Sequence, residues 1–196
     1  MGDADPREPI RRRIAEHVET MKAILDSEDS VAAIEGAADR IEECYRKGGK
    51  VFFMGNGGSA ADAQHLATEL VSRFYLERRA LCAEALTVNS SILTGIGNDY
   101  DFERIFSRQL EAAARPGDVA FGISTSGNSP NVLAAMRTAR SIGAATIGFT
   151  GEKGGLLAGC VDICLAVPSS DTPRIQEAHI LAGHIICEIV EKRLFS

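Results

Sequence analysis

The sequence predicts a three-layer α/β fold of flavodoxin-like type, in which a five-stranded parallel sheet is flanked by helices and preceded by two further helices. The chain has 196 residues, of which 45% are hydrophobic, so one core of ordinary size is expected. After residue 50, short apolar runs alternate with helical segments, which is typical of a parallel sheet with crossover helices. No repeat or linker divides the chain, so residues 1–196 are expected to form one domain.

Residues 1–49 are expected to form a pair of amphipathic helices. In the first, roughly Ile10 to Leu25, apolar residues recur three or four positions apart. The second is expected to begin after a cap at Ser30 and to end at Gly48-Gly49. Because neither helix has a strand of its own, we expect them to pack across the core or against another subunit.

Residues 50–196 are expected to form the α/β core. The expected strands are Val51–Met54, Ala83–Val88, Val119–Ile123, Ala145–Phe149 and Ile163–Val167. The expected helices lie at about 59–73, 101–114, 130–142, 154–159 and 172–194. In such sheets ligands bind beyond the carboxyl ends of the strands, so the loops that leave these ends are where a site is expected.

Charge and composition argue against several classes of partner. A net charge of −6 disfavours attraction to nucleic acid or to an anionic membrane surface. No apolar stretch approaches the roughly 18 residues of a membrane span, and the charged, proline-bearing start does not resemble a secretion signal. The five cysteines are scattered through apolar segments, which predicts free, buried thiols. A cytoplasmic location is therefore expected.

A glycine-rich loop follows the first expected strand. It reads Gly55-Asn56-Gly57-Gly58-Ser59 and leads directly into a helix. Glycine lets the backbone turn sharply and present its amides, and a helix N-terminus attracts an anion. One interpretation is a phosphate site, and the other is a tight turn that Ser59 caps.

A hydroxyl-rich loop follows the third expected strand. Ser124, Thr125, Ser126 and Ser129 lie within six positions, just before a helix that Pro130 can begin. Hydroxyl donors together with helix amides can bind a phosphate dianion without lysine. A solvated loop is the alternative, but two such loops after two strands of one sheet favour a phosphorylated ligand.

Two helical segments carry candidates for chemistry. His65 and Glu69 lie four positions apart on one helix face, where they can hold a divalent ion such as Zn²⁺ or form a plain surface hydrogen bond. His179 and His184 are five apart on the last helix and point about 140° away from each other, so they are not expected to serve one site. His184 lies among apolar neighbours and is also a candidate core histidine.

A carboxylate and an imidazole are sufficient for aldose–ketose isomerisation, in which a proton next to a carbonyl is removed and returned. A metal could stabilise the negative charge that develops. These residue types alone do not distinguish isomerisation from hydrolysis or from binding.

Four motifs, in this order, resemble those of the phosphoheptose isomerases, which are single-domain members of the sugar-isomerase (SIS) domain fold. They are residues 55–65 with Glu69, Gly97-Asn98-Asp99-Tyr100, residues 124–129, and Arg174-Ile175-Gln176-Glu177 with His184. The resemblance spans nearly the whole chain. It implies conversion of sedoheptulose 7-phosphate into D-glycero-D-manno-heptose 7-phosphate, the entry step to the heptose of bacterial lipopolysaccharide or related glycans. It also implies a homotetramer with active sites between subunits.

The resemblance further implies residue roles. One zinc ion per subunit would be held by His65, Glu69, Gln176 and His184, with Glu69 as general base and His184 as general acid. The implied substrate contacts are Asn56, Gly57, Gly58, Ser59, Glu69, Asn98, Asp99, Ser124, Thr125, Ser126, Ser129 and Gln176. Gln176 and His184 lie eight positions apart, about 12 Å along a helix, so both reach one ion only from beside the middle of that span. Because neutral glutamine is a weak zinc donor, Gln176 is the weakest candidate ligand and loose metal binding is expected.

Two alternatives remain open at this point. A non-catalytic protein of the same fold, either a phosphosugar sensor or a replication-initiator-associating protein, would bind a sugar phosphate without turnover. The second kind lacks the metal-site glutamate, so the presence of Glu69 together with His184 favours the enzyme. An isomerase for another ketose phosphate would share every motif and differ in the depth of its pocket.

Overall fold

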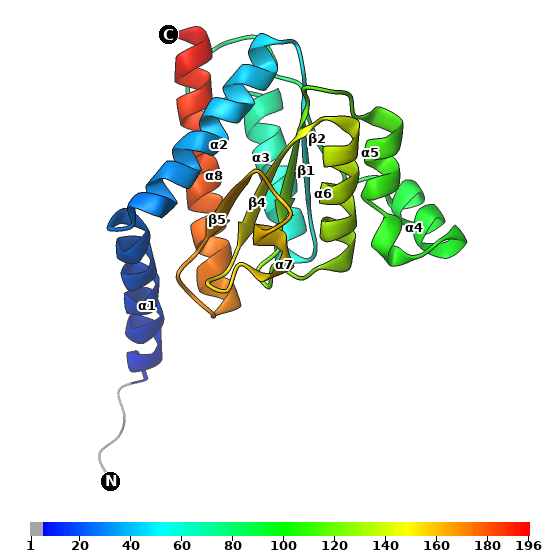
Figure 1. The fold of residues 1–196 in the computed structure, drawn as a ribbon. Helices are drawn as coiled ribbons and strands as arrows, with labels where there is room; N and C mark the ends of the chain where they lie inside the picture. Colours follow the sequence, from blue (N-terminus) through cyan, green and yellow to red (C-terminus); the bar gives the residue numbers. More distant parts are fainter. Residues whose placement is uncertain (1–5) are drawn as a thin grey trace.

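The computed structural model of the chain describes residues 6–196 and contains one sheet of five parallel strands. The strands are β1 Val51–Gly55, β2 Ala83–Ala85, β3 Val119–Ile123, β4 Ala145–Thr150 and β5 Ile163–Ala166. Their spatial order is β2-β1-β3-β4-β5 (Figure 1). This is the doubly wound, flavodoxin-like order, so the predicted fold class is confirmed.

The helices of the structure are α1 Glu8–Leu25, α2 Glu28–Arg46, α3 Gly58–Val71, α4 Ser90–Asp99, α5 Ser107–Ala113, α6 Pro130–Ile142, α7 Gly155–Ala158 and α8 Thr172–Phe195, with a 3₁₀ turn at Phe102–Arg104. Helices cover both faces of the sheet (Figure 1). Successive strand residues point to opposite faces. Phe53 accordingly packs in a cluster with residues of α2, α3 and α8, while Phe52 packs in a second cluster with residues of α5, α6 and α7.

The two leading helices behave differently. Helix α2 packs against α8 and the sheet and buries Ile34 and Ile41, as expected for a helix that crosses the core. Its cap is Ser27 rather than the predicted Ser30: the Ser27 hydroxyl accepts the Ser30 backbone N–H at 3.2 Å. Helix α1 extends beyond the α/β body (Figure 1) and leaves a stripe of apolar side chains exposed.

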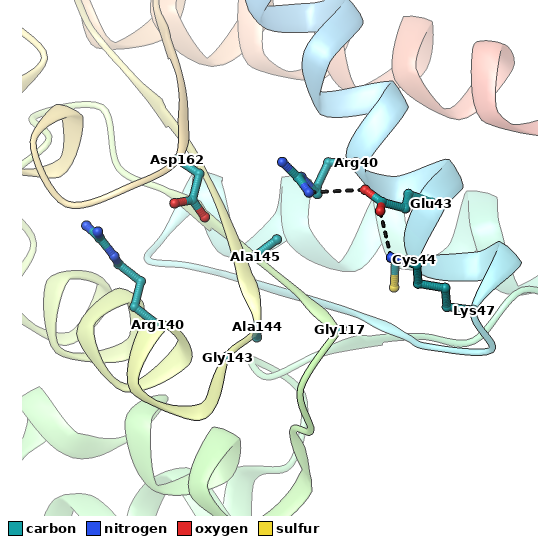
Figure 2. A pocket seen from close by; sticks show the side chains of 10 residues that line it. All are labelled: Arg40, Glu43, Cys44, Lys47, Gly117, Arg140, Gly143, Ala144, Ala145 and Asp162. Atoms are coloured by element: carbon teal, nitrogen blue, oxygen red, sulfur yellow. Dashed lines mark hydrogen bonds and ion pairs between the residues drawn. The ribbon is translucent and has the colours of Figure 1, made fainter.

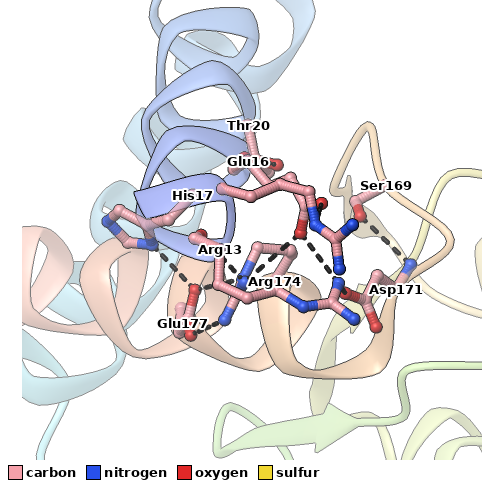
Figure 3. Close-up of polar contacts among 9 residues, drawn as sticks. Arg13, Glu16, His17, Thr20, Ser169, Asp171, Arg174 and Glu177 are labelled. Carbon is pink, nitrogen blue, oxygen red and sulfur yellow. Dashed lines mark hydrogen bonds and ion pairs between the residues drawn. The ribbon is translucent and has the colours of Figure 1, made fainter. Parts of the chain in front are cut away.

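A polar network fixes α1 against the start of α8 (Figure 3). The His17 ring lies 2.8 Å from the Glu177 carboxylate, and Arg174 both pairs with Glu177 and donates to the Arg13 carbonyl at 3.0 Å. Arg13 in turn lies 3.3 Å from Asp171. The first turn of α8 is therefore held from the α1 side.

Four further expectations need correction. Strand β2 ends at Ala85 instead of Val88, and the segment 101–114 is a 3₁₀ turn followed by the short α5 rather than one helix. Helix α4 was not expected, because Gly95 and Gly97 disfavour a helix and none of its residues is buried. The cysteines are all free, as predicted, but only Cys44 and Cys187 are buried; Cys160 and Cys164 are half-buried and Cys82 is exposed.

The amino-terminal end of the sheet carries a cleft of about 380 Å³ between α2 and α6 (Figure 2). Its charges are largely paired among themselves: Glu43 lies 3.1 Å from Arg40 and 2.7 Å from Lys47. The lining includes none of the predicted site residues, which lie on loops at the other end of the strands and on α3, α4 and α8. Within residues 6–196, no helix combines the length and the apolar character that crossing a bilayer requires.

Candidate functional site

The two loops predicted to bind phosphate leave the same edge of the sheet. Strands β1 and β3 are hydrogen-bonded neighbours, with Gly55 opposite Ile123, so the loops after them begin side by side. Two reciprocal amide hydrogen bonds of 2.9 and 2.8 Å join Asn56 to Asn131, which is 2% exposed at the start of α6. The glycine loop is thus fixed to the helix that follows the serine loop.

Gln176 of α8 lies over the glycine loop, residues 55–59, at this edge of the sheet. Gly57 occupies the cap position of α3 with a φ of +57°, which favours glycine. Ser59 lies inside the helix and is buried, so the interpretation of Ser59 as the cap is wrong. A Cβ atom at Gly58 would fall 2.5 Å from the Gln176 amide nitrogen, which shows that Gln176 lies directly over the loop.

The serine loop, residues 124–129, holds its hydroxyl groups at the same edge of the sheet. The Ser124 and Ser129 hydroxyls share a hydrogen bond of 2.9 Å, and the Ser126 hydroxyl accepts the Asn128 N–H at 3.1 Å. Gly127 has a φ of +66°, and a Cβ atom there would lie 2.1 Å from the Gly154 carbonyl oxygen. Only glycine permits this turn, which holds the four hydroxyl residues together.

His65, Glu69 and His184 converge where α3 packs on α8. The His65 Nε2 atom lies 3.1 Å from Glu69 Oε1 and 2.9 Å from His184 Nε2. Gly183 permits this approach, because a Cβ atom there would lie 2.5 Å from the Leu66 side chain. One ligand atom from each of the three lies within 4.8 Å of the others. Two imidazoles and one carboxylate fit Zn²⁺ as three protein ligands of a four-coordinate ion.

His179 is the core histidine of α8, whereas His184 belongs to the cluster. The His179 ring is fully buried and its Nε2–H donates to the Thr150 carbonyl at 3.1 Å. Burial lowers the pKa of His179 from 6.5 to about 4, and the hydrogen bond to Thr150 offsets only part of this effect. The two histidines therefore face different surroundings, as their spacing predicted.

The remaining predicted residues lie around this centre. Asn98 and Asp99 are exposed at the end of α4, where the Asn98 amide donates to the Asp99 carboxylate at 3.0 Å. Asp101 and Phe102, which follow them, line a cleft together with Asn56 and other residues of the two loops. Contacts of Asn98 and Asp99 with a substrate stay a prediction, as does metal ligation by Gln176.

Sequence reasoning missed Asp62. It lies three positions before His65, hence on the same face of α3, and its buried carboxylate oxygen Oδ2 has no hydrogen-bond partner among residues 6–196. Burial raises the pKa of Asp62 to about 6, an effect that nearby His65 partly offsets. The spacing of residues 62, 65 and 69 at three and four positions is the signal that would have found it.

Comparison with known proteins adds an independent observation. The SIS domain family matches residues 14–151. The phosphoheptose isomerase of Roseiflexus sp. (strain RS-1) is 58% identical over 86% of this chain and 85% of its own length. That of Clostridium acetobutylicum is 52% identical over 95% of both chains. The solved phosphoheptose isomerase of Neisseria gonorrhoeae is 40% identical with a TM-score of 0.90, covering 96% of this chain and 100% of its own. The chain belongs to the SIS domain family and, within it, to the phosphoheptose isomerases.

Proposed function

We propose that this protein is an aldose–ketose isomerase that converts sedoheptulose 7-phosphate into D-glycero-D-manno-heptose 7-phosphate, a precursor of heptose-containing glycans. The observation that supports the proposal is that the His65–Glu69–His184 cluster and the two phosphate-type loops are linked through Gln176 in a chain that belongs to the phosphoheptose isomerases. Gln176 lies on α8, the helix that also carries His184, and its side chain lies over the glycine loop. The glycine loop is hydrogen-bonded to the start of α6, which directly follows the serine loop.

In this proposal the serine loop binds the phosphate group. Ser124, Thr125, Ser126 and Ser129 offer hydroxyl donors at the carboxyl end of β3, and the net charge of −6 makes such local donors necessary. Asn56, Gly57 and Gly58 would contact the sugar from the neighbouring loop, with Ser59 buried behind them. Asn98, Asp99 and Gln176 would complete the substrate contacts.

The proton transfer is assigned to Glu69 and His184. For a 2-ketose, the Glu69 carboxylate removes a proton from C1, next to the C2 carbonyl, and a proton is then returned to C2. His184 acts as the general acid that supplies the proton on O2, while the proton on O1 leaves to restore a carbonyl at C1. A Zn²⁺ ion held by His65, Glu69 and His184, with Gln176 as a weaker fourth ligand, would supply positive charge beside the oxygens.

The proposal includes a homotetramer with active sites between subunits. Its support is an exposed apolar stripe on α1, made of Ile10, Ile14, Val18 and Leu25. The stripe is continuous with a groove of about 620 Å³ between α1, α2 and α8, in which Leu181 and Ile185 lie. Contiguous exposed apolar surface of this kind marks an interface between proteins. Light scattering coupled to size-exclusion chromatography would measure the mass, and a monomer at micromolar concentration would contradict this assembly.

The proposal also retains the cytoplasmic location predicted from the sequence, for which the free cysteines are the support.

The activity is tested by incubating the purified protein with sedoheptulose 7-phosphate, with and without a metal chelator, and following the aldose signals by NMR. We expect aldose formation that the chelator abolishes and added zinc restores. Binding of the ketose without turnover in the presence of zinc would favour a non-catalytic sensor instead. Faster conversion of fructose 6-phosphate than of the seven-carbon ketose would assign the enzyme to another substrate.

A further inference from the structure

A buried ion pair lies behind the His65–Glu69–His184 cluster. Arg78 follows the end of α3, Glu191 lies near the end of α8, and their side chains are 2% and 1% exposed. The Arg78 Nε atom lies 2.9 Å from Glu191 Oε1. Charges removed from water are costly unless they are paired and their remaining hydrogen-bonding groups are satisfied.

The Glu191 carboxylate organises the turn that follows α3. It accepts three consecutive backbone N–H groups, from Phe74 at 2.9 Å, Tyr75 at 2.6 Å and Leu76 at 2.8 Å. Burial raises the pKa of Glu191, but these N–H donors and Arg78 outweigh burial, so its pKa lies below the ordinary value. The carboxylate is therefore ionised at neutral pH, and the turn closes around it.

The Arg78 guanidinium binds the carbonyl groups at the end of α3. It donates to the carbonyls of Glu69 at 3.0 Å, Leu70 at 2.8 Å and Ser72 at 3.2 Å. The last carbonyls of a helix have no partner within the helix, so Arg78 acts as their cap. One of these carbonyls belongs to Glu69 itself, so the cap contacts the backbone that carries this carboxylate.

The same pair also reaches His184. Phe74, whose N–H Glu191 accepts, places its ring centroid 5.7 Å from that of His184. The ion pair thus contacts the backbone of Glu69 directly and holds the aromatic ring that flanks His184. Neither Arg78 nor Glu191 belongs to the cluster itself.

We propose that the Arg78–Glu191 pair is a positioning device that sets Glu69 and His184 at the geometry needed for proton transfer. This inference rests on the roles given to those two residues under the proposed function. It assigns the pair a part in turnover that goes beyond its contribution to stability. Misplacement of a reacting group by about 1 Å can cost about a hundredfold in rate, so small shifts of the α3 end are sufficient.

The test removes both charges at once, because a single substitution would leave one charge buried and unpaired. Arg78→Met combined with Glu191→Gln leaves no buried charge, and removing both charges of a buried pair costs less stability than removing one. We expect a folded protein whose kcat falls about tenfold to a hundredfold, while KM stays within about twofold, because substrate-binding loops are untouched. Zinc affinity, measured by competition with a chromophoric chelator, should fall about tenfold.

A matched control lies on the same helix. Glu188→Gln breaks the exposed ion pair in which Glu188 Oε1 lies 2.6 Å from Lys192 Nζ. This variant should leave kcat and zinc affinity unchanged. If the double variant does not fold, Arg78→Lys is measured instead, because it retains the buried charge but loses the planar fork that binds the carbonyls. Parental kcat and zinc affinity in the folded variant would overturn the inference. Glu69→Gln is assayed in parallel. Full activity of that variant would show that the proposed base is wrong, whereas loss of its activity together with parental kcat in the double variant would show that only the positioning role is wrong.

Discussion

Acidification from pH 7 to pH 5 should destabilise the folded chain through His179. This ring is fully buried between β4 and α8, and burial lowers its pKa from 6.5 to about 4. Its Nε2–H already donates to the Thr150 carbonyl, and its buried Nδ1 atom has no hydrogen-bond partner in the part of the chain that the structure describes. A second proton would therefore place a charge and an unpaired N–H group in the core.

The sign and the size of the effect follow from the two pKa values. Because the folded pKa lies below the unfolded one, the unfolded chain binds more protons between about pH 4 and 6.5, and the free energy of unfolding falls as the pH falls. At about 1.4 kcal/mol per pKa unit, the loss between pH 7 and pH 5 is about 2 kcal/mol, rising to about 3 kcal/mol below pH 4.

Urea unfolding of the chelator-treated protein and of a His179→Gln variant, each at pH 7 and at pH 5, checks this value. Asp62 titrates with the opposite sign, because burial raises its pKa to about 6. It is present in both chains, so the difference between their pH dependences isolates His179. The parent should lose about 2 kcal/mol more than the variant. Equal losses in the two chains would refute a buried neutral histidine.

Three substitutions test the site. Glu69→Gln should lower kcat at least about a hundredfold with an unchanged circular dichroism spectrum, because the base is lost. The control is Glu77→Gln, at a side chain that is 90% exposed, and parental kcat in Glu69→Gln would remove the assignment of Glu69 as the base. Ser124→Ala should raise KM about tenfold with kcat retained, whereas Ser141→Ala, at an exposed hydroxyl, should leave KM unchanged. An unchanged KM in Ser124→Ala would count against phosphate binding by the serine loop. Asn131→Ala should lower the free energy of unfolding by about 1–3 kcal/mol in urea titrations, because both amide bonds to the glycine loop are lost, and no change would show that the two loops are not coupled.

The sequence by itself determined the sheet type, the positions of the five strands and the loops that form the candidate site. These features depend on short-range patterns: apolar runs of strand length, glycine where the chain must turn, and helical spacing that places His65 and Glu69 on one face. The motif resemblance, not the spacing, pointed to His184. Spacing alone left His184 as a candidate core residue, and the structure gives that place to His179.

Only the tertiary structure decided which side chains meet across the core. His184 lies 119 positions from His65, and their contact depends on the rotation of α8 about its axis and on the close approach of α3 at Gly183. The Arg78–Glu191 pair, 113 positions apart, has no local signal, because exposed and buried charges look alike in a sequence. Burial is a property of packing between distant segments, so the fold alone determined which charges become positioning contacts and which histidine stays neutral.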